Sequence, residues 1–262
     1  MANPASLVLE DGSVYQGYTF GAERESYGEV VFNTSMTGYQ EMLTDPSYAG
    51  QIVTMTYPLI GNYGINERDF ESRKVQVAGF VVREHCTEPS HAMSTGTLTD
   101  FLESQGIPAI SGVDTRAITR IVREQGMQKA AICHKQDGNI DLDALIEAAR
   151  AWNGLETADL AADVDTDAPF ENAQRLWQVS GGYSDMADAK HHVVVVDFGV
   201  KKNILRNLAH VGARATVVRG DTPFEEIMKL GPDGVVLSNG PGDPAATIKR
   251  CGETIRKLID SG

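Results

Sequence analysis

Hydrophobic and polar residues alternate differently in two parts of the chain. From residue 6 to about residue 135, apolar or alternating runs separated by turn residues are typical of β-strands: SLVLE, SVYQGYTF, GEVVFNT, GQIVTMTYP, VQVAGFVVRE and QKAAICHK. Helical patterns interrupt them at 97–105 and 114–125, and a further helix is predicted at 141–151. For the second helix, Asp114 is the expected N-cap and Gly126 the expected stop. We therefore predict a β-rich α/β domain over residues 1–152.

After residue 191, strands and helices alternate regularly. We predict strands at 193–197, 214–218 and 234–237, each followed by a helix, at 201–211, 223–229 and 245–260. Short apolar strands joined by helical crossovers indicate a parallel sheet that is covered on both faces, so residues 191–262 are predicted to form a βαβαβα unit.

The segment between these two parts, residues 153–190, is weakly periodic and is predicted to be a linker. Residues 141–190 contain 11 acidic and 3 basic side chains. A stretch with this balance is typical of a solvated surface or a connector rather than of a specific binding site.

Charge and composition exclude several classes of function. The chain of 262 residues has a formal net charge of −13, so it lacks the basic surplus that nucleic-acid binding requires. No run approaches the roughly 18 apolar residues of a membrane span, and the N-terminus has no signal-peptide pattern. The three cysteines, Cys86, Cys133 and Cys251, are few and widely spaced, which argues against disulfides and a zinc site. We expect a cytoplasmic protein without a metal site.

One loop has a composition suited to binding. Residues 238–244 read SNGPGDP and follow the predicted strand 234–237 directly. Gly240 and Gly242 permit close approach to the backbone, Pro241 stiffens the loop, and Asp243 and Pro244 are a good N-cap and first residue for the next helix. Such a loop suits a carboxylate ligand or a developing oxyanion, although a plain, well-capped turn explains it equally well. The chain has no phosphate-binding glycine motif, which disfavours a nucleotide-binding enzyme.

The same loop resembles the signature loop of class I glutamine amidotransferases. DFGVKKNILRNL, residues 197–208, is similar to the first strand and helix of that domain in the small, glutaminase subunits of carbamoyl-phosphate synthetase. The match is closer still at residues 28–66, which begin GEVVFNTSMTGYQE, and at GVDTRAITRIVREQG, residues 112–126. Both segments resemble the N-terminal domain of these subunits, which other amidotransferases lack, so the resemblance spans essentially the whole chain.

The resemblance implies a function and a set of binding residues. The small subunit of this family hydrolyses L-glutamine and passes ammonia to a large subunit, which uses ATP, Mg²⁺ and bicarbonate to make carbamoyl phosphate for pyrimidine and arginine biosynthesis. The positions that contact glutamine in the family correspond to Ser47 in DPSY and to Gly240 and Gly242. No cofactor is expected on this chain itself, and the large subunit is the expected partner in a heterodimer.

The resemblance also implies residues that the 262 residues do not contain. The nucleophile of the family is a cysteine in a Gly-x-Cys-x-Gly-His turn after the next strand, with His and Glu later, so all three are expected beyond Gly262. None of the three cysteines has that context, and no catalytic residue is assigned. We expect the chain to be the N-terminal part of a glutaminase subunit and to be inactive alone. The alternative is a naturally short, non-catalytic binding or scaffold module for the synthetase subunit.

Overall fold

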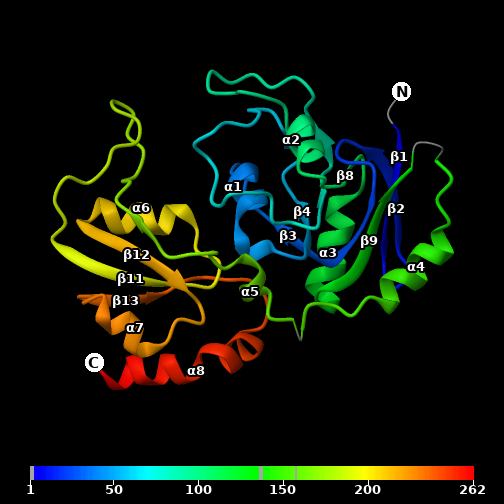
Figure 1. Cartoon of the computed structure of the whole chain (residues 1–262). Helices are drawn as coiled ribbons and strands as arrows, with labels where there is room; N and C mark the ends of the chain where they lie inside the picture. The colour runs from blue at the N-terminus through cyan, green and yellow to red at the C-terminus, as the bar shows by residue number, and fades with distance from the viewer. Residues whose placement is uncertain (1–2, 136–137, 157) are drawn as a thin grey trace. The chain divides into compact units, whose positions relative to one another are not determined.

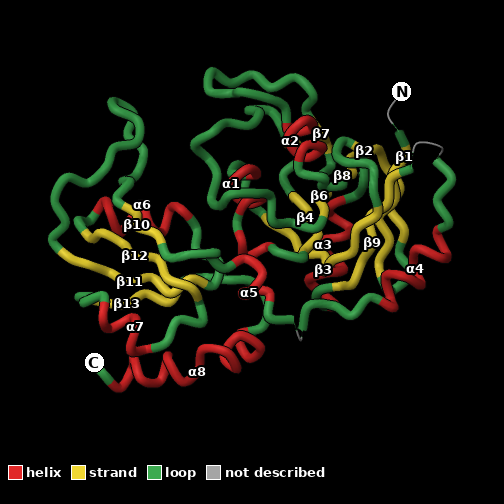
Figure 2. Tube along the Cα trace, in the orientation of Figure 1, coloured by secondary structure: helices red, strands yellow, loops and turns green. Residues whose placement is uncertain are grey.

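The computed structural model describes residues 3–135, 138–156 and 158–262. Its contacts divide the chain into two units. The first contains the residues before Asp45 together with Tyr48–Leu155, and the second contains Asp45–Ser47 and Glu156–Gly262. Both are mixtures of helices and strands (Figures 1 and 2), which confirms the α/β class. The short segment Asp45–Ser47 thus groups with residues that lie more than 100 positions later in the chain.

A closed barrel forms the centre of the first unit. Its strands follow the order β1-β2-β8-β6-β4-β3-β9 around the barrel. Their bounds are Pro4–Leu9 (β1), Val14–Thr19 (β2), Glu25–Asn33 (β3), Gln51–Met55 (β4), Gly79–Val81 (β6), Ala109–Ser111 (β8) and Gln128–His134 (β9). The neighbours β3-β4, β4-β6 and β6-β8 are parallel and the other pairs are antiparallel. The sequence predicted strands in this region but not their closure.

Helices pack against the strands of this barrel. Their bounds are Tyr39–Thr44 (α1), Leu98–Ser104 (α2), Thr115–Gln125 (α3) and Leu142–Ala151 (α4). A two-stranded parallel sheet pairs Leu59–Ile60 (β5) with Glu84–His85 (β7). The 3-10 turn Pro46–Tyr48 contains Pro46 and Ser47, which group with the second unit. Asp114 caps α3 by accepting a hydrogen bond from the Ala117 N–H, and Gly126 ends it with a φ of +87°. The predicted caps of this helix are therefore confirmed.

The alternation of side chains along β9 shows how the core is divided. Ala130 and Ile132 pack into the cluster that contains the buried face of α3, whereas Ala131 and Cys133 pack against α4.

His134 ends the strand on the same face as Ile132 and is only 7% exposed. Neither of its ring nitrogens has a hydrogen-bond partner among the described residues.

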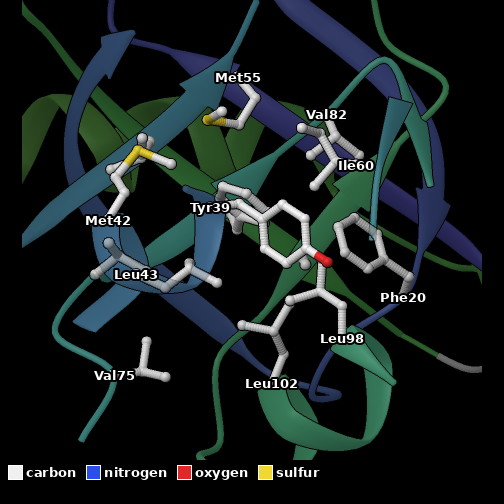
Figure 3. Packing of buried hydrophobic residues seen from close by; sticks show 14 of the residues in the cluster. Phe20, Tyr39, Met42, Leu43, Met55, Ile60, Val75, Val82, Leu98 and Leu102 are labelled. Carbon is white, nitrogen blue, oxygen red and sulfur yellow. The ribbon is translucent and has the colours of Figure 1, made fainter. Parts of the chain in front are cut away.

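A second apolar cluster lies between the strands and helices α1 and α2. Figure 3 shows Tyr39 at its centre, with Leu98 and Leu102 of α2 beside it and Phe20 nearby. The Tyr39 hydroxyl donates a hydrogen bond to the Gly64 carbonyl oxygen at 2.7 Å, so the one polar atom of this ring is satisfied inside the cluster.

The second unit is a four-stranded sheet with the order β10-β12-β11-β13. The strand bounds are Phe170–Asn172 (β10), His191–Asp197 (β11), Ala213–Arg219 (β12) and Gly234–Leu237 (β13), and the helix bounds are Leu160–Val164 (α5), Lys202–His210 (α6), Phe224–Lys229 (α7) and Pro244–Asp260 (α8). β11, β12 and β13 are parallel, as predicted. Figure 1 shows α6 on one face of the sheet and α7 and α8 on the other.

Two short elements lie in the segment predicted to be a linker. Within residues 153–190, of which residue 157 lies outside the described residues, the structure contains α5 and β10. β10 pairs with β12 in the antiparallel direction, which the sequence did not predict, because FEN is short and mostly exposed. In the described part of the chain, β13 pairs with β11 alone, so one of its edges is open.

Candidate functional site

The carboxyl ends of two neighbouring parallel strands support the candidate site. β11 ends at Asp197 and β13 ends at Leu237, and the two strands are adjacent in the sheet. Ligands in open α/β sheets bind outside such ends. The loops that follow are joined directly, because the Phe198 N–H donates to the Ser238 hydroxyl oxygen at 2.9 Å.

Asp197 shapes the loop after β11. One of its carboxylate oxygens accepts hydrogen bonds from the N–H groups of Gly199 and Val200, at 2.8 and 2.7 Å, and the other accepts from the Thr166 N–H at 3.0 Å. The buried carboxylate is therefore used for structure and is not free to act on a ligand. Gly199 has a φ of +121°, a conformation that favours glycine.

The loop SNGPGDP needs both of its glycines. A Cβ atom on Gly240 would lie 2.2 Å from the backbone oxygen of Phe198, so only glycine fits between the two loops. Gly242 has a φ of +77°, which other residues rarely adopt. Asp243 accepts a hydrogen bond from the Ala245 N–H at 2.8 Å, and Pro244 is the first residue of α8. The predicted cap and helix start are confirmed.

Ser47 lies beside this loop within the second unit. The Asn239 Nδ2 group donates to Ser47 Oγ at 2.9 Å, and Asn239 immediately precedes Gly240. The Ser47 N–H donates to an Asp45 carboxylate oxygen at 2.9 Å, and the other oxygen of that carboxylate lies 3.4 Å from the Lys201 Nζ. The structure thus brings one of the three predicted glutamine-contacting residues to the loop that contains the other two. Whether they bind glutamine stays a prediction.

Sequence reasoning missed Asn239 and Lys201. Asn239 is bonded to the Ser47 side chain and Lys201 is paired with Asp45, although both lie more than 150 residues away in the chain. The only signal for Asn239 was its position between the end of a strand and the first glycine of the loop. Nothing in the sequence indicated that Asp45 would contact Lys201.

A cavity of about 200 Å³ lies between the same loop and α8. Gly240, Pro241, Gly242 and Cys251 contribute to its mostly apolar wall. Pockets for small ligands usually measure about 300–1,000 Å³ and place several polar groups around the ligand. The wall offers few polar groups to pair with the carboxylate and ammonium groups of glutamine, so this cavity by itself is not a complete site for that ligand.

Cys251 in this wall has the features of a packed thiol. It is 3% exposed, and burial raises the pKa of its thiol. Its Sγ donates a hydrogen bond to the Thr247 carbonyl oxygen at 3.3 Å, which requires the protonated form. A cysteine nucleophile needs a lowered pKa and access to its substrate. Cys133 is buried as well, and burial also raises its pKa.

The described residues contain neither a metal-binding cluster nor a membrane-spanning helix. Residues 3–135, 138–156 and 158–262 contain no group of three or more His, Cys, Asp or Glu side chains that could hold a metal ion. Across the same residues, every helix is too short or too polar to span a bilayer.

Comparison with known proteins identifies the family. Residues 7–132 match the family model described as carbamoyl-phosphate synthase small chain, CPSase domain, and residues 194–262 match glutamine amidotransferase class-I. Across 260 residues the chain is 48% identical to the carbamoyl phosphate synthase small chain of Caulobacter vibrioides, covering 98% of this chain and 67% of that one. The chain belongs to the carbamoyl phosphate synthase small chain family.

Other members of the family agree with this assignment. The small chain of Syntrophotalea carbinolica is 49% identical over 258 residues, covering 97% of this chain and 67% of its own length. That of Bradyrhizobium diazoefficiens is 47% identical over 262 residues, covering 98% and 66%. The chain thus spans about two thirds of the length of these relatives. The loops described above lie in the region that matches the amidotransferase model.

Proposed function

We propose that this chain supplies part of the glutamine-binding site of a glutamine-hydrolysing carbamoyl phosphate synthase. In this proposal L-glutamine is hydrolysed on the small subunit, and ammonia passes to a large subunit that makes carbamoyl phosphate from bicarbonate and ATP. The carbamoyl phosphate then serves pyrimidine and arginine biosynthesis, in the cytoplasm. Family membership and the two domain matches support the proposal.

One observation carries the assignment of the site. Ser47, a residue from the segment between α1 and β4, is hydrogen-bonded to the residue that precedes Gly240 in the amidotransferase loop. A serine hydroxyl beside a stiff glycine loop and a helix N-terminus provides donors for a carboxylate or a carbonyl oxygen. Glutamine carries both groups, so the local chemistry fits the substrate that the family implies.

The test uses the protein as its gene encodes it, purified with the synthetase large subunit of the same organism. Carbamoyl phosphate formation is measured with glutamine and separately with ammonium chloride. We expect both to support synthesis, and Ser47→Ala to raise the KM for glutamine while leaving the ammonia reaction unchanged. A complex that forms but uses ammonia alone would favour the alternative, a non-catalytic docking module, and would contradict the proposal.

The 262 residues alone give a second test. Cys133 and Cys251 are buried, and the partly exposed Cys86 donates its thiol proton to the Glu88 carbonyl oxygen, so we expect no release of ammonia from glutamine. Ammonia release that survives purification and disappears in Cys251→Ser would show that Cys251 is catalytic and not merely a packed thiol.

A further inference from the structure

The side-chain amide of Asn239 has an orientation that the backbone dictates. Its Nδ2 atom lies 2.9 Å from the carbonyl oxygen of Gly199 and 2.9 Å from Ser47 Oγ. A carbonyl oxygen only accepts hydrogen bonds, so the group that faces Gly199 must be the amide NH₂ and not the amide oxygen. The reverse orientation would place two acceptors against each other.

This orientation decides how Ser47 can hydrogen-bond. The NH₂ group of Asn239 has no free lone pair to accept with, so Ser47 Oγ must be the acceptor in the bond between them. A serine hydroxyl also carries one donor proton. No described residue accepts that proton, and Ser47 is only partly buried. The Ser47 O–H therefore remains available to a ligand as a donor.

We infer that Asn239 is a positioning residue that fixes the Ser47 hydroxyl as a hydrogen-bond donor toward an oxygen atom of bound glutamine. This inference rests on the proposed function. It assigns Ser47 to a carboxylate or carbonyl oxygen of the substrate and excludes the substrate ammonium group, which needs an acceptor. Asn239 itself acts through Ser47.

The backbone of Ser47 is held by a separate contact, so Asn239 controls the side chain specifically. The Ser47 N–H is bonded to Asp45, which is paired with Lys201. In addition, Asn239 Oδ1 is buried without a partner among the described residues. An unpaired buried amide oxygen lowers the free energy of unfolding, so stability alone does not explain an asparagine at this position. Loss of this side chain should therefore affect substrate binding more than folding.

A double-mutant cycle on the complete complex tests the inference. We expect Asn239→Ala and Ser47→Ala each to raise the KM for glutamine about 10-fold with little change in kcat, because Ser47→Ala removes the bond to a substrate oxygen and Asn239→Ala removes the contact that orients it. The double variant should be no worse than Ser47→Ala, because Asn239 acts only through Ser47. The KM does not depend on the fraction of enzyme that is folded, so it is still compared if the alanine variant folds poorly.

The control is Asn207→Ala on α6, where the amide makes a local bond to the Asn203 carbonyl oxygen on an exposed helix face. It should leave the KM for glutamine unchanged, and all variants should keep the ammonia-dependent reaction. If the effects of Asn239→Ala and Ser47→Ala multiply in the double variant, the inference is overturned while the proposed function stands. If the wild-type complex does not use glutamine, the proposed function itself fails, and the inference fails with it.

Discussion

Arg250 of α8 ties α5 to the rest of the second unit, and its removal is the most direct test of how this unit is held together. Its Nε lies 3.0 Å from an Asp159 carboxylate oxygen, and its Nη1 lies 3.2 Å from Oδ2 of Asp165. These two aspartates flank α5 on either side. Arg250→Met keeps most of the length and apolar stem of the side chain and removes its charge and donors.

The size of the effect follows from the burial of the two partners. The Asp165 side chain is 1% exposed, and without Arg250 it keeps one hydrogen bond, from the Gly220 N–H at 3.0 Å, and a weak pair with Arg219 at 3.9 Å. Loss of a hydrogen bond to a buried charged group costs roughly 1.5–3 kcal/mol. The Asp159 pair is more exposed and adds about 0.5 kcal/mol. We expect the free energy of unfolding of this unit to fall by about 2–3 kcal/mol at neutral pH.

The pH dependence of the effect is a sharper test than its size. Burial raises the pKa of the Asp165 carboxyl, while the Gly220 N–H and Arg250 act to lower it. A carboxyl whose pKa is raised on folding favours the folded state at low pH, and that contribution is lost as the pH rises through the folded-state pKa. Removal of Arg250 raises this pKa further. The destabilisation by Arg250→Met should therefore be largest where Asp165 is ionised and shrink as the pH falls through the raised folded-state pKa of Asp165.

The assay must report on the second unit alone, because a chain with two units has no single free energy of unfolding. Urea unfolding is followed by the fluorescence of Trp177 in a Trp152→Phe background, since Trp177 belongs to the second unit and Trp152 to the first. Arg256→Met, an exposed position on the same helix, is the control and should change stability by less than about 0.5 kcal/mol. Equal effects of the two substitutions, or a difference that grows in acid, would refute the reasoning.

Three further predictions concern single sites. His134→Leu should stabilise the first unit by about 1–2 kcal/mol in urea unfolding, because both buried ring nitrogens are unpaired; a loss of stability would show that the ring has a partner. Gly240→Ala places a Cβ 2.2 Å from the Phe198 backbone oxygen and should lower the free energy of unfolding of the second unit by about 2 kcal/mol. The control, Gly234→Ala, meets no atom within 4 Å and should not lower it. Equal effects of the two variants in thermal unfolding would contradict the contact. Iodoacetamide followed by mass spectrometry should label partly exposed Cys86 before Cys251, whose pKa is raised by burial, and the opposite order would mean that Cys251 is accessible.

The elements with strong local signals were predictable from the sequence. Asp114 and Gly126 bound α3, and Asp243 and Pro244 begin α8, because capping depends on residues within one turn of the helix end. The parallel direction of β11, β12 and β13 follows from the helices that connect them. These features need no knowledge of distant contacts.

The features that depend on distant contacts were not predictable. The first barrel strand, β1, pairs with β9, which lies more than 120 residues later, and nothing within either strand specifies that partner. β10 is a short, exposed strand that forms only because the edge of β12 is available. Ser47 was predicted as a glutamine contact from family resemblance. The proposed role of Asn239 rests on its hydrogen bonds to Ser47 and Gly199, which are distant in the sequence.

The grouping of Asp45–Ser47 with the second unit has a consequence for how such proteins can be recombined. A gene fragment that starts at Glu156 encodes the sheet and both loops but omits the serine that is bonded to Asn239. A chimera can join residues 1–155 of one relative to the remaining residues of another. It would then take Ser47 from one parent and Asn239 from the other. Exchange at Glu156 therefore splits the candidate site between two parents, and under the proposed function the codons for residues 45–47 should be exchanged together with those for residues 156–262.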